Sequence, residues 1–350
     1  MTNLLMLAST KVDPSRANYH VSGLLWSTVF IVLIIALCLD LFVFNRHEHE
    51  VSMKEAALAS CLWIALGIAF GIHVYFDISS QAAGQYFAAY VLEKSLSVDN
   101  LFVIALLFSY FAVPKIYQHR VLYWGVIGAL VLRGIFIALG AVLIARFEFV
   151  LAIFGIILLL SAYKMSFSSH DAVDPEKNPL LKLMRKRMKM TKHYQGKKFF
   201  IVSKGIRYAT PLFAVLLIVE TTDVVFAFDS IPAVFGISSD PFIVFSSNAF
   251  AILGLRSLYF LIAGLLGKFE SLKYGLSFIL AFIGVKLMAG YLFDWHPPEW
   301  LSLGVIAVSL GVSITYSILV PSKSVEIDEH LGEGLVDLDE AFDDAPEEEL

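Results

Sequence analysis

The sequence predicts an all-α membrane protein, a polytopic helical bundle with about nine spans. Of its 350 residues, 58% are hydrophobic and only 16% are charged, whereas soluble domains are about 45–50% apolar. Apolar runs of about 20 residues, the length that crosses the hydrocarbon core of a bilayer, recur along the chain. Runs this long and continuous favour helices over barrel strands, which alternate over short segments.

The candidate spans follow one another with short connections, apart from one large loop. We expect residues 1–20 to form an external tail. The first run is longer than a signal-peptide core and lacks a cleavage site, so we expect it to be retained in a transmembrane domain covering residues 21–320. The nine candidate spans lie near residues 21–44, 55–76, 82–110, 119–145, 148–168, 208–237, 242–266, 270–293 and 299–320.

The large loop, about residues 169–207, contains 11 Lys or Arg. Cytoplasmic loops carry the excess of Lys and Arg, so this loop is expected inside the cell, with the N-terminus outside and the C-terminus inside. A basic loop between spans is typical of a topology signal or of contact with lipid headgroups, and we expect no nucleic-acid partner. The last thirty residues, 321–350, hold 12 Asp or Glu and one Lys, which predicts a disordered, acidic cytoplasmic tail.

The most informative segment is Val219–Ala233, an apolar stretch that carries Glu220, Asp223 and Asp229. A carboxylate at the bilayer centre costs about 2.5–3.5 kcal/mol on insertion scales, so such residues usually face the protein interior or an ion path. These acids therefore indicate a functional site.

The motif occurs twice. Glu93, Asp99 and Asn100 repeat the order of Asp223, Asp229 and Ser230 at an offset of 130 residues. The third span and the sixth should run in opposite directions, which predicts 3+3 inverted-topology repeats, about 82–168 and about 208–293, followed by a last span at about 299–320. Secondary transporters often have this plan, with a binding site near the midplane.

The acids cannot all face one ion from unbroken helices, because Glu93 and Asp99 lie about 120° apart around an ideal helix. We therefore expect the third and sixth spans to be interrupted near Ser95 and Ser97 and near Ser230 and Pro232, which would free carbonyl oxygens as ligands.

The candidate ligands offer oxygen but no thiolate or imidazole, which favours hard divalent cations such as magnesium, calcium or manganese; copper is disfavoured and zinc remains open. The ion would be a transported substrate, and we expect no cofactor. The candidate metal ligands are Glu93, Asp99, Asn100, Glu220, Asp223 and Asp229.

Intramembrane basic residues accompany these acids. Arg133 and Arg256, one in each repeat, are expected to hold the carboxylates when no cation is bound, and Lys94 is expected to help or to compete with the ion. The alternative is that the charges form buried ion pairs that only fix helix packing, although such pairs add little net stability. The expected charge partners are Lys94, Arg133, Arg256, Lys164 and Lys286.

The runs at 93–100, 220–233 and 240–264 resemble the TerC/Alx family of integral membrane proteins, and the resemblance extends over about residues 20–320. It implies a protein of the bacterial inner membrane that takes part in metal homeostasis, associated with manganese export and, by the family's older name, with tellurite resistance. The family's intramembrane acids fall on the candidate ligands named above.

We therefore expect a secondary transporter, not an enzyme, that exports Mn2+ or a similar ion, with proton coupling as a possible energy source because no nucleotide-binding loop is present. One alternative is a non-transporting membrane scaffold for metalloid stress. An intramembrane aspartyl protease using Asp99 and Asp229 is disfavoured, because the GxGD pattern is missing.

Overall fold

The computed structural model describes residues 19, 21–42, 52–147, 149–167, 189–191, 193–203, 205–263, 272–293, 295, 297 and 299–319. The predicted N-terminal tail apart from Tyr19, the predicted C-terminal tail and most of the basic loop lie outside these residues. The helices are α1 (Gly23–Phe42), α2 (Met53–Asp77), α3 (Ser80–Tyr110), α4 (Lys115–Arg146), α5 (Phe149–Phe167), α7 (Pro211–Phe235), α8 (Pro241–Ile252), α9 (Leu255–Ala263), α10 (Leu272–Phe293) and α11 (Glu299–Leu319).

Each predicted span corresponds to a helix or, for 242–266, to the pair α8 and α9. Six of the described helices are long and apolar enough to cross a membrane, or seven if the bent pair α8–α9 counts as one span. Two predicted spans fall outside this count. The 31-residue helix α3 contains Glu93, Lys94 and Asp99, and the apolar part of α11 is short, Leu301–Ser317.

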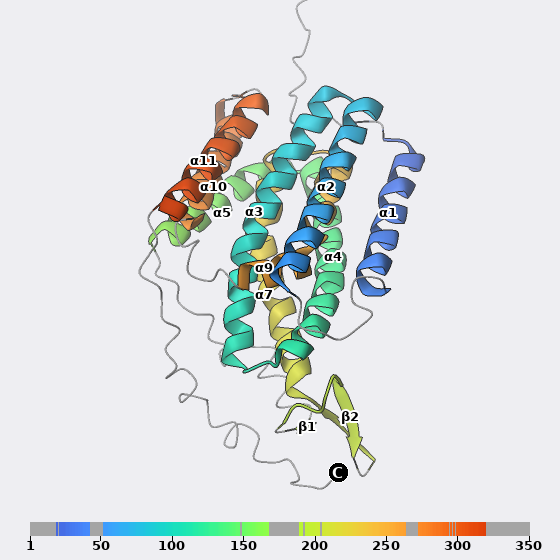
Figure 1. Ribbon diagram of the computed structural model, residues 1–350. Helices are drawn as coiled ribbons and strands as arrows, with labels where there is room; N and C mark the ends of the chain where they lie inside the picture. Colours follow the sequence, from blue (N-terminus) through green and yellow to red (C-terminus); the bar gives the residue numbers. More distant parts are fainter. Residues whose placement is uncertain are drawn as a thin grey trace, which may run out of the picture.

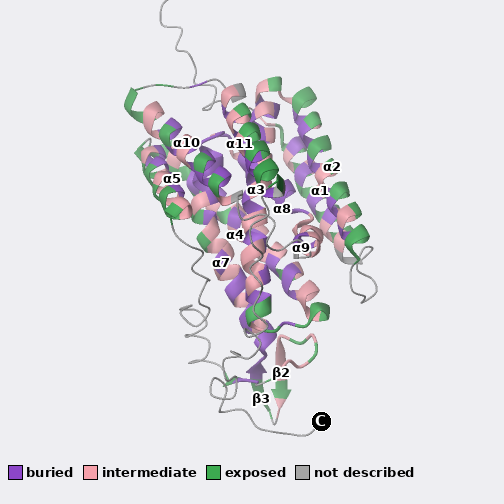
Figure 2. Ribbon diagram, turned by 60° about the vertical axis from the view of Figure 1, so that its left-hand side comes forward, coloured by how far each residue is buried: buried purple, intermediate pink, exposed green. Residues whose placement is uncertain are grey.

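Side chains are distributed as in a bundle with an apolar exterior (Figure 2). Large apolar residues such as Leu24, Phe76 and Phe293 are exposed, while polar residues such as Gln85 and Asn248 are buried among the central helices. Lipid is the medium that would cover an apolar exterior of this extent.

Contacts along the central helices fix their relative directions. Gly125 of α4 lies beside Val219 of α7, and farther along both helices Gly140 lies beside Phe235, so α4 and α7 are parallel. Helix α3 runs the opposite way: its end at Phe108 shares an apolar cluster with Leu212 at the start of α7. The two acidic motifs are therefore carried on antiparallel helices (Figure 1).

The prediction that the third and sixth spans are interrupted is wrong. Helix α3 continues through Ser95 and Ser97, whose hydroxyls donate to the carbonyl oxygens of Val91 and Glu93 at 2.7 Å. Hydroxyls bonded back to the preceding turn are compatible with a continuous helix. Helix α7 continues past Ser230 as far as Phe235. Pro232 lies inside this helix and removes one backbone hydrogen bond near its end, but it does not interrupt the helix.

The break lies in the seventh predicted span instead. Helices α8 and α9 meet at Leu253 and Gly254 with a bend of 46°. Gly254 has a φ of +77°, a left-handed conformation that glycine adopts at little cost.

Helix α8 begins at a buried aspartate. Asp240 Oδ1 accepts hydrogen bonds from the backbone N–H groups of Phe242 and Ile243, and Oδ2 accepts one from Tyr19 at 2.8 Å. Burial raises the pKa of Asp240, while these three donors act in the opposite direction. The cap fixes where α8 starts and ties the chain before α1 to it.

A small sheet, which the sequence did not suggest, lies where the basic loop meets α7 (Figure 1). Its strands β1 (Lys189–Met190), β2 (Phe200–Ser203) and β3 (Ile206–Ala209) are in the order β1-β3-β2, with β1 parallel and β2 antiparallel to β3. The Tyr194 hydroxyl donates to the carbonyl oxygen of Phe111 at 2.7 Å, which attaches this end of the loop to the α3–α4 turn.

Candidate functional site

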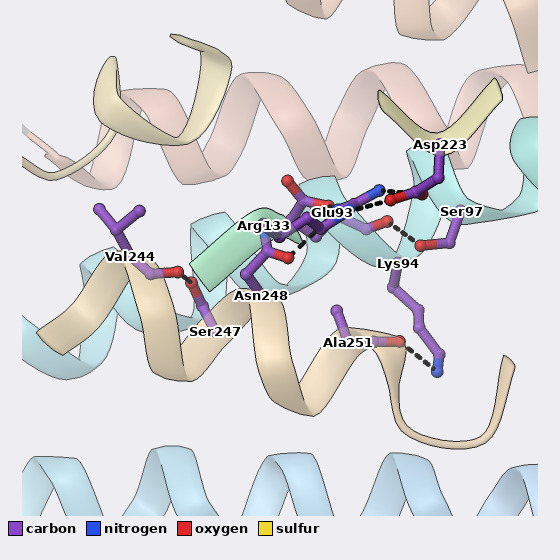
Figure 3. Close-up of polar contacts among 9 residues, drawn as sticks. All are labelled: Glu93, Lys94, Ser97, Arg133, Asp223, Val244, Ser247, Asn248 and Ala251. Carbon is purple, nitrogen blue, oxygen red and sulfur yellow. Dashed lines mark hydrogen bonds and ion pairs between the residues drawn. The ribbon is translucent and has the colours of Figure 1, made fainter. Parts of the chain in front are cut away.

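Four helices each contribute one polar side chain to a buried cluster centred on Arg133 (Figure 3). Arg133 of α4 donates through Nη1 to Glu93 Oε2 of α3 at 2.5 Å and to Asn248 Oδ1 of α8 at 3.2 Å. Its Nη2 and Nε donate to the two carboxylate oxygens of Asp223 on α7, at 3.2 and 3.4 Å. We call Glu93, Arg133, Asp223 and Asn248 the Arg133 cluster.

The Arg133 cluster is shielded from solvent. The side chains of Arg133 and Glu93 are 2% and 0% exposed, and that of Asp223 is 18% exposed. Two carboxylates face one guanidinium, so the cluster carries more acidic than basic groups. In addition, Glu93 Oε1 has no hydrogen-bond partner among the described residues. A buried oxygen of this kind is expensive to leave unsatisfied, and it is available to a cation.

Glu220 lies one turn before Asp223 on α7 and packs against Gly128 of α4. Its Oε2 atom is buried, and no hydrogen-bond partner for it occurs in the part of the chain that the structure describes. A Cβ atom at Gly128 would overlap both carboxylate oxygens of Glu220. The missing side chain at Gly128 is therefore what gives the Glu220 carboxylate its place between α4 and α7.

Replacing Gly128 by alanine should displace Glu220 without unfolding the protein. The neighbour that must move is the flexible end of a side chain, and alanine in a helix gains about 0.5–1 kcal/mol over glycine. We expect Gly128→Ala to keep its thermal stability but to bind Mn2+ more weakly than the unsubstituted chain. Gly125→Ala is the matched control, because its Cβ would meet only Val219 Cγ1 at 3.4 Å. Equal ion affinity in the two variants would show that the place of Glu220 is unimportant.

Asp229, the last acid of the second motif, lies apart from the Arg133 cluster. Six residues separate it from Asp223, about 9 Å along a helix axis. Its Oδ1 accepts a hydrogen bond from Ser161 Oγ of α5 at 2.5 Å, and Lys164 acts on it electrostatically. In the first motif, Asp99 and the buried Asn100 lie on α3 a turn and a half or more beyond Glu93.

The predicted basic partners have different roles. Arg133 contacts carboxylates of both motifs, but its expected counterpart Arg256 contacts neither: Arg256 Nη2 pairs with Asp40 of α1, at 2.8 Å from Oδ2 and 2.6 Å from the carbonyl oxygen. Lys94 Nζ donates to backbone carbonyls of α8 and of the break, and Lys286 Nζ donates to Ser302 Oγ at 3.2 Å.

The six predicted ligands thus do not converge on one point in this structure. Within the described part of the chain, no three His, Cys, Asp or Glu side chains lie close enough together to hold a metal ion. What the fold does bring together is Glu93 and Asp223, one acid from each motif, with Glu220 one turn away.

Several residues of the site were not expected from the sequence. Asn248 occurs in the polar run SSN inside an apolar span, a pattern that could have indicated it. Asp40 is the one acid of the first predicted span. Ser161 and Gly128 gave no signal, because a single serine or glycine in a spanning helix is common.

Fold and site together define the class of this protein: an integral, multi-pass, α-helical membrane protein with an ionised cluster buried among its central helices. The model of the integral membrane protein TerC family matches residues 78–325. The chain belongs to this family, as the resemblance of its acidic motifs predicted.

Several curated proteins are similar over most of their length. An uncharacterised membrane protein of Myxococcus xanthus is 45% identical over 295 residues, which cover 84% of this chain and 92% of that protein. A protein of Escherichia coli (strain K12) named Alx, described as a candidate membrane-bound redox modulator, is 43% identical over 293 residues, covering 81% and 90%. An uncharacterised membrane protein of Rickettsia bellii is 36% identical, covering 84% and 97%. No solved structure matches the chain.

Proposed function

We propose that this protein is a secondary transporter of the bacterial inner membrane that exports Mn2+, or a similar hard divalent cation, by alternating access. The observation that carries the proposal is the Arg133 cluster, in which one guanidinium holds carboxylates from two antiparallel motif helices. Buried intramembrane charges usually mark an ion path, and carboxylate and carbonyl oxygens are the ligands that Mn2+ prefers.

The Arg133 cluster suggests a mechanism in which a divalent metal ion replaces the Arg133 guanidinium as the partner of the carboxylates. Without metal, Arg133 pairs with both Glu93 and Asp223 and offsets one of their two negative charges. A divalent ion would first meet Glu93 Oε1 and Glu220 Oε2, the two oxygens of these acids that have no hydrogen-bond partner within the described ranges. It would then compete with Arg133 for the carboxylates. Release of the ion on the other side would return the carboxylates to Arg133 or to protons, which is how proton coupling would arise.

Helix packing supports the inverted-repeat plan that alternating access commonly uses. If the chain contains two repeats, α3 corresponds to α7, α4 to α8–α9, and α5 to α10. A contact between α3 and α8 should then have a counterpart between α7 and α4, and both contacts occur. The α5–α10 contact is converted into itself. With the basic loop placed inside, as the positive-inside rule requires, α1 would enter from outside and the chain would end in the cytoplasm.

Mn2+ uptake by everted inner-membrane vesicles tests the proposal. We expect the native chain to accumulate Mn2+, and Glu93→Gln, Asp223→Asn, Asp99→Asn or Asp229→Asn to reduce uptake to background, because each removes a negative charge from the path. Asp77→Asn is the matched control: this acid pairs with His73 at the exposed end of α2. Normal flux in all four acid variants would exclude the carboxylate site.

A deletion of the acidic tail, tested both for Mn2+ uptake and for metalloid tolerance of the cells, separates transport from a scaffold role. Deleting residues 325–350, which hold most of the acidic tail, should leave most Mn2+ flux in a transporter, whereas a scaffold that recruits partners through this tail would lose its effect on metalloid tolerance.

A further inference from the structure

The break between α8 and α9 exposes backbone carbonyl groups inside the bundle. A helix leaves its last four carbonyl oxygens without helical partners, and α8 ends at Ile252, well inside the seventh predicted span. The carbonyl oxygens of Ala251 and Leu253 both accept hydrogen bonds from Lys94 Nζ, each at 3.0 Å. One ammonium group from α3 thus occupies the carbonyl pair. Figure 3 shows its contact with Ala251.

The break is held in place by the neighbouring helices. The Trp63 ring of α2 packs on Gly254, where a Cβ atom would come within 2.5 Å of it. Two residues later, Arg256 pairs with Asp40 of α1. The carbonyl oxygens of Ala251 and Leu253 are thus held in fixed positions and already bind the positive charge of Lys94. These are the properties expected of a cation site. The negative end of the α8 dipole adds to this attraction.

We infer that the carbonyl oxygens of Ala251 and Leu253 form a second site for the transported divalent cation, and that Lys94 is a tethered cation which occupies this site until the metal ion arrives. The inference rests on the proposed function. Carbonyl oxygens suit Mg2+, Ca2+ and Mn2+, and carbonyls at interrupted helices coordinate ions in other transporters.

The position of Lys94 couples this site to the Arg133 cluster. Lys94 follows Glu93 directly on α3, so Glu93 holds Arg133 while Lys94 holds the broken helix. A displacement of α3 that separates Glu93 from Arg133 would also withdraw Lys94 from the carbonyl pair. One movement would then open both sites to the ion.

Removing the ammonium should make the site easier to fill. When only a fraction of the protein can bind, the apparent dissociation constant equals the intrinsic constant divided by that fraction. If Lys94 leaves the carbonyl pair free in about a tenth of the molecules, removing its charge should lower the apparent dissociation constant about tenfold. We expect Lys94→Met, which keeps length but not charge, to bind Mn2+ about that much more tightly than the native chain. Lys94→Arg retains the charge and should bind no more tightly.

The measurement is Mn2+ binding to the purified full chain in lipid nanodiscs, followed by the loss of the free-ion electron paramagnetic resonance signal. Lys273→Met is the matched control, since this lysine lies at the start of α10 over the Tyr274 ring, and its affinity should equal that of the native chain. Thermal unfolding is the second readout: Lys94→Met should lose stability without metal and regain it in Mn2+, more than the native chain does.

The outcomes distinguish the inference from the proposed function. If the native chain binds and transports Mn2+ but Lys94→Met binds no tighter, or Lys94→Arg binds tighter, the carbonyl site is overturned and the transporter stands. If the native chain neither binds nor transports Mn2+ but Lys94→Met does bind it, the site stands and the export proposal fails. No binding in any variant overturns both. If Lys94→Met folds only when purified in Mn2+, the site is supported, and if Mn2+ does not rescue its folding, the site is overturned.

Discussion

Replacing Arg133 by methionine should destabilise the protein by about 3–5 kcal/mol, because removing one partner of a buried ion pair leaves its counter-charges uncompensated. Here two carboxylates, Glu93 and Asp223, would lose their hydrogen bonds at once. The free energy of unfolding can be measured by equilibrium denaturation in mixed micelles. Arg207→Met is the matched control, since Arg207 is exposed on β3 over the Phe200 ring, and surface changes are usually within about 0.5 kcal/mol.

A second comparison tests the cause of this loss. Adding Glu93→Gln and Asp223→Asn to Arg133→Met makes the cluster neutral, and replacing a whole buried ion pair is often nearly neutral in stability. The triple variant should therefore recover much of the loss. Arg133→Met should also be stabilised by Mn2+ more than the native chain is, because the ion can take the place of the guanidinium. An Arg133→Met variant as stable as the native chain would mean that the acids are not held by this residue.

Replacing Gly254 by alanine should lower the free energy of unfolding by about 2–5 kcal/mol. A non-glycine residue in the left-handed region costs about 1–2 kcal/mol, and forcing a new methyl group into a packed interior costs about 1–3 kcal/mol. Both apply here, because Gly254 has a φ of +77° and its Cβ would meet three atoms of Trp63. We expect a lower free energy of unfolding and, since the break positions Lys94, slower ion transport.

Gly205→Ala separates the two contributions. Gly205 has a φ of +78° but nothing within 4 Å of its Cβ position, so it should show the backbone cost alone. The difference between the two glycine variants then measures the contact with Trp63. Equal losses at both positions would show that Trp63 yields freely, and that the break is not fixed by α2.

The sequence predicts the helices of this fold well because its signal is physical and local. Each run of about 20 apolar residues can satisfy its backbone in lipid only as a helix, and helices such as α2 and α5 lie close to their predicted spans. The small sheet was missed because β2 and β3 are four residues each, in a loop whose basic composition dominates its pattern.

The site was predicted in part, for a related reason. The cost of burying Glu93 and Asp223 is evident in the sequence, and the repeat indicates that they belong together. What the sequence does not specify is the partner of each charge. The equivalence of Arg133 and Arg256 suggested equal roles, yet Arg256 reaches Asp40, an acid more than two hundred residues earlier. Likewise, the helix breaks at Gly254 and not beside the acids. A positive φ costs a glycine little free energy, whereas breaking the helix near the serines would cost backbone hydrogen bonds.

The backbones of helices α5 and α10 approach each other closely at a pair of glycines, Gly155 and Gly284. The Cβ position of each glycine, Gly155 and Gly284, lies 3.0 Å from the carbonyl oxygen of the other, and Ser277 Oγ of α10 donates to Ala162 O of α5 at 2.7 Å. Because the two backbones are in direct contact, α5 and α10 cannot slide easily past each other, and we expect them to move together as one rigid unit. Ser161 belongs to α5 and therefore to this unit, whereas Asp229 belongs to α7. In the proposed transport cycle, any axial sliding of α7 must therefore stretch the hydrogen bond between Ser161 and Asp229, and the length of that bond would report how far α7 has moved.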